Sequence, residues 1–306
     1  MMKKNEIKRI PLIIDTDPGT DDSVALLILA QNIQNFDLKL ICSTAGNTPI
    51  EKTTTNCQFF AKNFFPGVKV AKGVSKALVH NLAPNAEFVH GETGMGDYNP
   101  GKQDYPYEED SAVAMYEVLN NSTEPVTLVT LGPMTNIARL LIMYPNIKSK
   151  IKEIYAMIGS INGHGNVTKY AEFNSYFDPE AFQIVAKSGI RIIFNSIELG
   201  EMAKFPKTEL QNITPKNEKE QMILEILNGM HEINDPDSLF LYDANSVMAL
   251  TEPKLYNLIP CDVEVSTQKD TYGQCFMTPN KKGLHCYQEI KNIQDIVDYI
   301  TNQLFG

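Results

Sequence analysis

The chain opens with short apolar runs that alternate with stretches whose apolar residues recur every three or four positions. Residues 10–14 are continuously apolar, as in a strand buried on both faces of a parallel sheet. Turn-forming residues follow at 15–20, and a helix is predicted at 23–31. The same pattern predicts strands at 36–43, 126–131, 151–158 and 190–194, and helices at 48–65, 107–119, 135–144 and 178–188. Repeated strand–helix units predict an α/β fold with a doubly wound, mostly parallel open sheet and flanking helices.

Two of these helices carry recognisable start signals. Thr48, with Glu51 three residues later, predicts a capping box for the helix at 48–65. Asp178 followed by Pro179 predicts a capped start for the helix at 178–188.

The pattern changes after residue 197. A polar amphipathic helix is predicted at 216–233 and further helices at 239–250 and 292–304. Short β segments at 262–265, 274–277 and 284–288 are predicted to form an edge sheet. No linker rich in proline, glycine or serine divides the chain, and no repeat is present. We therefore expect residues 1–306 to form a single domain.

Charge and cysteine content exclude several classes of partner. The 306 residues carry a net charge of −10 without a basic stripe, so nucleic acid is not expected as a partner. The five cysteines are odd in number and widely spaced, which argues against disulfides and zinc ribbons and favours reduced thiols in the cytoplasm. No apolar run approaches a membrane span, and the run at 10–14 is too short for the core of a signal peptide.

Four carboxylates follow the first predicted strand within eight residues. Asp15, Asp17, Asp21 and Asp22 lie where ligands bind in open α/β sheets, at the carboxyl end of a strand. A divalent cation would offset their mutual repulsion, and dense oxygen ligands suit Ca²⁺ or Mg²⁺. The alternative is a solvated acidic turn in which the acids merely complement the helix dipole.

The same loop resembles a known family. Residues 15–25 read D-T-D-P-G-T-D-D-S-V-A, which is similar to the D-x-D-P-G-x-D-D-A-x-A signature of inosine–uridine-preferring nucleoside hydrolases. The D-x-D-x-T motif of dehalogenase-type phosphatases fits less well, because Thr20 falls one position too late.

The resemblance extends over nearly the whole chain. Similar segments are the end of the second strand at 43–47, the His-Gly-x-x-Gly loop at 90–94, Gly-Pro-Met-Thr-Asn at 132–136, Met157 with its following glycine, Gly165-Asn166, Ala-Glu-Phe-Asn at 171–174 and Asp-Pro-Glu-Ala at 178–181. These similarities imply the nucleoside hydrolase fold and hydrolysis of the N-glycosidic bond of a ribonucleoside.

Site roles follow from the resemblance. It implies that Asp17, Asp22 and Asp243 bind Ca²⁺ through side chains and Leu131 through its carbonyl, with Asp17 activating a Ca²⁺-bound water. Ribose contacts are implied for Asp21, Asn47, Met157, Asn166, Glu172 and Asn174. A homo-oligomer, dimer or tetramer, is implied as well. Each asparagine alone would be typical of a turn, and only their joint spacing favours a ligand role.

The sequence departs from the family at the leaving-group end. Tyr242 precedes the metal ligand Asp243 where many relatives have a histidine that protonates the base. A tyrosine has an ordinary pKa of about 10, against about 6.5 for histidine, so it donates a proton less readily at neutral pH. Tyr242 could hydrogen-bond the base while His90 or His231 supplies the proton. The chain has no tryptophan to stack on a purine.

Two hypotheses about activity remain open from the sequence. One is an active hydrolase with an altered base preference, and the other is a catalytically weak homologue that binds nucleoside or ribose as a sensor or partner protein. We also expect the long loops at 80–101 and 229–242 to move or order when substrate binds.

Overall fold

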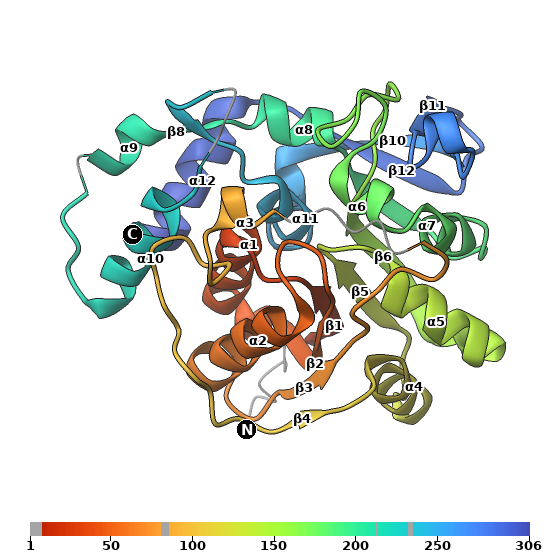
Figure 1. The fold of residues 1–306 in the computed structure, drawn as a ribbon, viewed down its shortest axis with the longest axis horizontal. Helices are drawn as coiled ribbons and strands as arrows, with labels where there is room; N and C mark the ends of the chain where they lie inside the picture. Colours follow the sequence, from red (N-terminus) through yellow and green to blue (C-terminus); the bar gives the residue numbers. More distant parts are fainter. Residues whose placement is uncertain (1–7, 81–85, 212, 232–234) are drawn as a thin grey trace, which may run out of the picture.

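The computed structural model describes residues 8–80, 86–211, 213–231 and 235–306. Within these ranges, ten strands form one sheet in the order β11-β10-β12-β7-β6-β5-β1-β2-β3-β4 (Figure 1). Neighbouring strands from β12 to β4 pair in parallel, whereas β10 is antiparallel to both β11 and β12. The predicted α/β fold with a mostly parallel open sheet and flanking helices is confirmed.

The strands of this sheet are β1 (Ile10–Thr16), β2 (Phe36–Ser43), β3 (Lys69–Lys72), β4 (Tyr107–Glu108), β5 (Val126–Thr130), β6 (Ile151–Met157), β7 (Ile192–Asn195), β10 (Tyr256–Val265), β11 (Cys275–Pro279) and β12 (His285–Ile290). A separate two-stranded ribbon pairs β8 (Phe205–Pro206) with β9 (Ser238–Leu239).

The helices are α1 (Thr20–Gln31), α2 (Ile50–Phe64), α3 (Glu87–His90), α4 (Ser111–Asn121), α5 (Thr135–Met143), α6 (Phe173–Phe177), α7 (Pro179–Ala186), α8 (Ile197–Met202), α9 (Lys207–Gln211), α10 (Glu218–Asn228), α11 (Tyr242–Thr251) and α12 (Ile293–Phe305). The described residues also form four 3₁₀ turns: η1 (Ile33–Asn35), η2 (Pro145–Lys150), η3 (Pro253–Leu255) and η4 (Lys269–Thr271).

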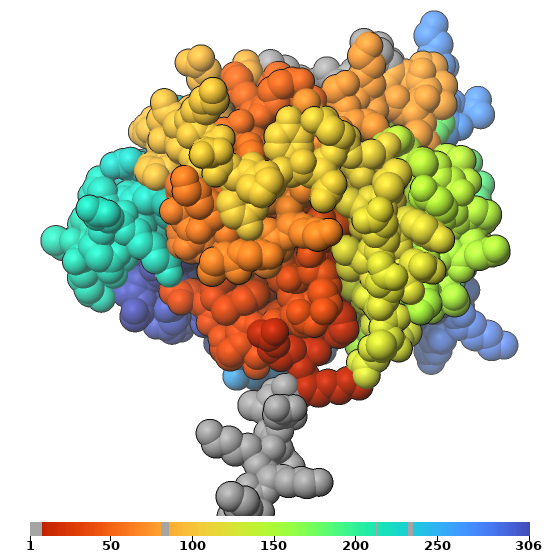
Figure 2. All heavy atoms as spheres, turned by 90° about the horizontal axis from the view of Figure 1, so that it is seen from below, coloured from red at the N-terminus to blue at the C-terminus, as the bar shows by residue number. Residues whose placement is uncertain are grey.

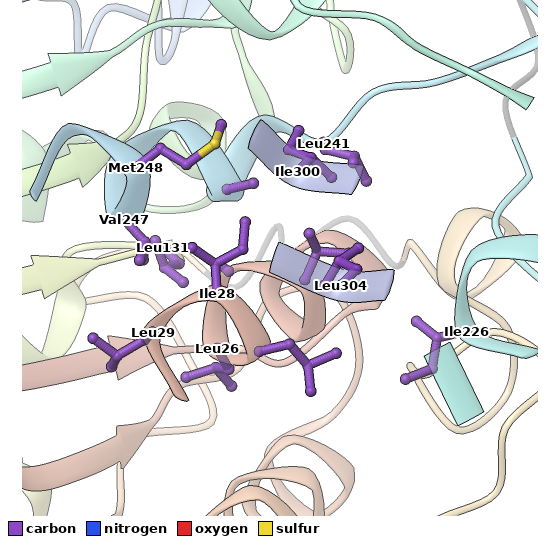
Figure 3. Packing of buried hydrophobic residues seen from close by; sticks show 14 of the residues in the cluster. Leu26, Ile28, Leu29, Leu131, Ile226, Leu241, Val247, Met248, Ile300 and Leu304 are labelled. Carbon is purple, nitrogen blue, oxygen red and sulfur yellow. The ribbon is translucent and has the colours of Figure 1, made fainter. Parts of the chain in front are cut away.

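The apolar strands are buried on both faces, as their sequences predict. Leu12 and Ile14 of β1 point into one core, while Ile13 between them points into the other. The first core includes residues of α1, α10, α11 and α12, and the second those of α4, α5 and α7. Figure 3 shows the first core, where Ile28 of α1 packs near Val247 of α11. Helix α1 is enclosed by α2, α10, α11 and α12, which explains why it is apolar around most of its circumference.

Several predicted helix boundaries are wrong. Pro49 precedes α2, and the Thr48 hydroxyl caps nothing, because a proline at this position already sets the backbone for the first turn. The helix predicted from 107 begins at 111, since Asp110 accepts hydrogen bonds from the amides of the first turn. The helix predicted at 216–233 spans only 218–228, and that predicted from 239 begins at 242. The Asp178 cap and its following Pro179 are confirmed.

The late β segments belong to the main sheet. The segments predicted at 262–265, 274–277 and 284–288 fall in or near β10, β11 and β12, and β12 joins them to β7.

Figure 2 shows the yellow segment after α3 lying over the orange elements before it. The Tyr105 hydroxyl holds this segment by donating to the Val68 carbonyl over 2.6 Å.

Parts of both loops predicted to move, residues 81–85 and 232–234, lie outside the described residues. All five cysteines are buried free thiols. In the described part of the chain, no helix combines the length and the apolar character needed to cross a bilayer.

The strand order places a crevice beside β1. From β1 the chain adds β2 and β3 on one side, and later β5, β6 and β7 on the other. The loops after β1 and β5 therefore diverge at the carboxyl ends of two neighbouring strands. Such a switch point is where open α/β sheets bind ligands.

Candidate active site

A cavity of about 440 Å³ opens at the carboxyl ends of these strands. It is lined by ten of the residues singled out from the sequence: Asp21, Asn47, His90, Leu131, Met157, Asn166, Glu172, Asn174, Tyr242 and Asp243. They come from loops and helix starts that are far apart in the chain. Asp17 and Asp22 lie just beneath this lining and are almost completely buried.

Three carboxylates converge at the floor of the cavity. Asp21, Asp22 and Asp243 each place an oxygen within 4.8 Å of the other two. Asp22 is held by the Gly19 amide over 2.9 Å and by the Thr16 hydroxyl. Because α11 starts at Tyr242, its first turn delivers Asp243 next to the first turn of α1.

Asp17 was predicted as a side-chain ligand, but the converging group holds Asp21 in its place; Asp17 is coupled to these carboxylates through their charges. Its Oδ2 accepts from the Asn47 amide over 2.7 Å, while its Oδ1 is buried without a hydrogen-bond partner among the described residues. Burial and the neighbouring Asp22 raise the pKa of Asp17 well above its ordinary range. Burial and the charge of Asp21 raise the pKa of Asp243 in the same way. Buried, mutually repelling carboxylates with an unpaired oxygen fit a hard divalent cation.

The backbone approaches Asp17 closely on one side. A Cβ atom on Gly46 would lie only 1.9 Å from the Asp17 Oδ2 atom. Glycine is therefore required here, because any side chain would displace the carboxylate. The neighbouring Asn47 then reaches back, and its Nδ2 donates to Asp22 over 2.9 Å and to the Asp17 carbonyl over 3.2 Å.

Asn174 links the ends of β5 and β6. Its Nδ2 donates to the Leu131 carbonyl over 2.8 Å and to the Met157 carbonyl over 3.0 Å. The Leu131 carbonyl, which is predicted to bind the metal, thus already accepts one hydrogen bond and retains a second lone pair. Asn166 is oriented by its own Oδ1, which accepts from the Phe173 amide over 2.9 Å.

Glu172 organises the wall beside Asn174. Its carboxylate caps α6, accepting from the amides of Asn174 over 2.7 Å and Ser175 over 3.0 Å, and from the Gly159 amide over 2.7 Å. Burial raises its pKa to about 7, and these three hydrogen bonds limit the rise. Glu172 therefore titrates near neutral pH.

Glu172→Gln is expected to change the pH dependence of stability. A raised pKa means that the wild-type carboxyl favours folding below about pH 4.5 and that this contribution is lost as the pH rises through about 7. The neutral glutamine has no such loss. The free energy of unfolding of Glu172→Gln relative to wild type should rise by roughly 3 kcal/mol between pH 4 and pH 8. Urea unfolding in a chelator measures it, with exposed Glu92→Gln as the control, and parallel wild-type and Glu172→Gln profiles would refute the assignment.

His90 lies on α3 at the edge of the cavity. Its Nδ1 accepts from the Thr20 amide over 3.2 Å and lies 2.9 Å from the Thr20 hydroxyl. Burial lowers its pKa to about 4, so the ring is neutral at pH 7. Since Nδ1 is an acceptor, the single ring proton resides on Nε2. His231, the other histidine considered, does not belong to the cavity lining.

Tyr242 forms part of the wall above Asp243. Its ring stacks on Phe240, with ring centroids 5.7 Å apart and planes inclined by 19°. Its carbonyl accepts a hydrogen bond from Asn195 at the end of β7. Phe240 itself lines the cavity and was not predicted, although its place two residues before Tyr242 was a usable signal. Phe88, Glu201 and Met230 also line the cavity, and no sequence pattern indicated them.

Comparison with solved structures confirms the fold. A plant nucleoside hydrolase, PpNRh1, superposes with a TM-score of 0.87 and 22% identity over 98% of this chain and 100% of that chain. A purine-preferring ribonucleoside hydrolase from Gardnerella vaginalis superposes with a TM-score of 0.82 and 22% identity, covering 96% and 98%.

Sequence comparison identifies the family. The family model of the inosine-uridine preferring nucleoside hydrolase matches residues 12–304. Two similar curated relatives are non-specific ribonucleoside hydrolases RihC: that of Escherichia fergusonii is 37% identical over 85% of each chain. That of Salmonella enteritidis is 35% identical over 84% of this chain and 83% of its own. The chain belongs to the inosine-uridine preferring nucleoside hydrolase family.

Proposed function

We propose that this protein is a Ca²⁺-dependent ribonucleoside hydrolase that releases ribose and a free base. The observation that carries the proposal is the cluster of buried carboxylates at the floor of a 440 Å³ cavity whose walls present amide groups. Oxygen-rich walls suit a ribose, because carboxylates and asparagines accept from and donate to its hydroxyls. The names of the curated relatives support the same activity.

The donor set fits calcium. Asp17, Asp22 and Asp243 and the Leu131 carbonyl supply only oxygen atoms, and ribose hydroxyls and water could complete a shell of six to eight. When bound, the ion would supply positive charge that neutralises the cluster, orients the sugar hydroxyls and acidifies a water molecule. The orphaned Asp17 Oδ1 supports this assignment, since a buried carboxylate oxygen requires a partner.

Asp17 is proposed as the general base. The Asn47 amide uses one lone pair of Oδ2, so the carboxylate keeps other lone pairs that can accept a proton from the water that attacks the sugar C1′. As the bond to the base breaks, positive charge develops on the ring. We propose that Asp21 and the oxygens of the surrounding wall, which line the cavity, stabilise that charge.

The remaining wall positions the sugar. Asn47, Asn166, Glu172 and Asn174 are proposed to bind ribose hydroxyls, with Met157 packing against the ring. The bond from Asn47 to Asp22, and the bonds that Asn166 and Glu172 accept from backbone amides, hold these side chains in place before substrate arrives. Such preorganisation lowers the cost of reaching the transition state.

Tyr242 and His90 are proposed at the leaving-base end. Both line the cavity. The Nε2–H of neutral His90 and the Tyr242 hydroxyl are the proton-bearing groups considered for the departing base. His90 is uncharged at neutral pH, and a tyrosine hydroxyl is a weaker acid than an imidazolium. We therefore expect the fastest hydrolysis with bases that can leave with little protonation.

The unbroken sheet supports the proposal that residues 1–306 form one domain. We also propose that the protein is cytoplasmic and assembles as a homo-oligomer, either a dimer or a tetramer. Sedimentation measures the oligomeric state directly, and a concentration-independent monomer would refute it.

The deciding experiment measures release of free base and reducing sugar from inosine, uridine, cytidine, adenosine, guanosine and nicotinamide riboside. We expect turnover on at least one of them that disappears in a chelator and returns with Ca²⁺. No turnover on any, with ribose still bound, would instead support the second hypothesis, a catalytically weak nucleoside-binding homologue. Turnover of p-nitrophenyl phosphate alone would support the phosphatase alternative.

A further inference from the structure

We propose that Gly200 is a positioning residue for Tyr242 and thereby sets which bases the cavity admits. The inference rests on the proposed hydrolase function. Gly200 is buried in α8, the short helix that packs against α11. A Cβ atom placed on it would lie 2.0 Å from Cδ1, 2.6 Å from Cε1 and 2.9 Å from Cγ of the Tyr242 ring. These distances are far below van der Waals contact, so the ring occupies the space that a side chain at residue 200 would fill.

The Tyr242 backbone cannot easily yield to such a side chain. Asn195, at the end of β7, donates through Nδ2 to the Tyr242 carbonyl and lies 3.4 Å from the Ser246 hydroxyl one turn later. The next residue, Asp243, is packed in the carboxylate cluster. Because its carbonyl and the next residue are held in this way, we expect Tyr242 to respond to a clash mainly by rotating its ring.

The Tyr242 ring is also in contact with a second aromatic side chain. Phe240 stacks on Tyr242, and the ammonium of Lys204 lies 5.3 Å from the centre of the Phe240 ring. Lys204 in turn pairs with Asp235 over 2.6 Å. The Tyr242 ring therefore lies against both Gly200 and Phe240. A methyl group on Gly200 would push the Tyr242 ring toward Phe240 or into the cavity that both aromatic side chains line.

Tyr242 and Phe240 line the end of the cavity where we place the base. Displacing the Tyr242 ring removes room and misdirects its hydroxyl. A two-ring purine needs more of that room than a one-ring pyrimidine. Gly200→Ala should therefore reduce kcat/KM for inosine about 10-fold or more, and reduce it less for uridine.

A double-mutant cycle tests whether the effect passes through Tyr242. Adding Gly200→Ala to Tyr242→Ala should change kcat/KM for either nucleoside by less than about twofold, because the clashing ring is gone. Met202→Ala, an exposed position on the same helix, is the matched control and should leave both values unchanged. An equal loss with and without Tyr242 would overturn the proposal.

Thermal unfolding gives a readout that does not depend on hydrolysis. It is measured for the parent, Gly200→Ala, Tyr242→Ala and the double variant. Alanine is a better helix former than glycine, so Gly200→Ala should raise Tm by about 1–3 °C in the Tyr242→Ala background. With Tyr242 present, the clash should cancel or reverse that rise. Equal rises in both backgrounds would refute the steric coupling. Absence of turnover in the parent would refute the hydrolase function alone, since the Tm cycle still decides the role of Gly200.

Discussion

Asp17→Asn is expected to lower kcat for ribonucleoside hydrolysis by about 10³-fold or more. Asparagine keeps the shape of the side chain and can still accept the Asn47 amide, which bonds Asp17 Oδ2 over 2.7 Å. It cannot accept a proton from water, and it offers the metal a weaker ligand. Loss of a general base alone typically costs 10²–10⁴-fold, and weaker metal binding adds to that loss.

The stability of the same variant should move in the opposite direction. Asp17 is buried among Asp21, Asp22 and Asp243, and its pKa is raised because ionisation there is unfavourable. A neutral amide relieves this repulsion, so in a chelator the Tm of Asp17→Asn should exceed that of wild type. Lost activity together with a higher Tm would exclude misfolding as the cause.

Asp37→Asn provides the control for this comparison, because Asp37 is a partly exposed aspartate that pairs with Lys39. It should retain wild-type kcat. Calcium titration calorimetry of Asp17→Asn then separates its two roles, since unchanged affinity with lost turnover assigns it as base alone. Retention of more than about a tenth of wild-type kcat would contradict both roles.

The central sheet was predictable because its strands are apolar on both faces. Ile13 points into one core and its neighbours Leu12 and Ile14 into the other, so the run has no polar alternation and indicates a buried parallel strand. Helix starts were less predictable. Thr48 has the residue type of a cap, but Pro49 begins the turn instead, and a local pattern does not reveal which signal prevails.

Some residues of the candidate active site could likewise be predicted from the sequence, and others could not. The acidic loop is contiguous in sequence, so its chemistry could be inferred before its geometry was known. Asp243 was placed by resemblance, and the structure brings it to within 4.8 Å of Asp21 and Asp22. Glu201 and Met230 reach the cavity only through the packing of α8 and α10, which no local pattern encodes. The packing of Tyr242 against Gly200 is likewise a tertiary contact between elements about 40 residues apart in sequence.

Removing calcium should abolish hydrolysis and should destabilise the protein increasingly as the pH rises. The folded-state pKa values of Asp17 and Asp243 lie well above the ordinary value of 3.8, because of burial and because of the neighbouring carboxylates. In the metal-free protein these groups therefore favour folding below about pH 4, and that contribution is lost as the pH rises through their folded-state values. Bound calcium reverses this trend, since it stabilises the ionised carboxylates.

The difference in Tm between calcium and chelator should accordingly be small at pH 5 and roughly 5 °C at pH 8, when calcium exceeds its dissociation constant about a hundredfold. Glu172 and His90 also have shifted pKa values, but they titrate in both samples, so most of their contribution cancels in the difference. Asp243→Asn should remove most of the calcium effect at every pH, because it deletes one of the converging carboxylates. A calcium effect that is equal at pH 5 and pH 8, or that persists in Asp243→Asn, would mean that the ion binds elsewhere. The carboxylate cluster would then have to be stabilised by sharing protons, a state incompatible with an ionised Asp17 acting as base at neutral pH.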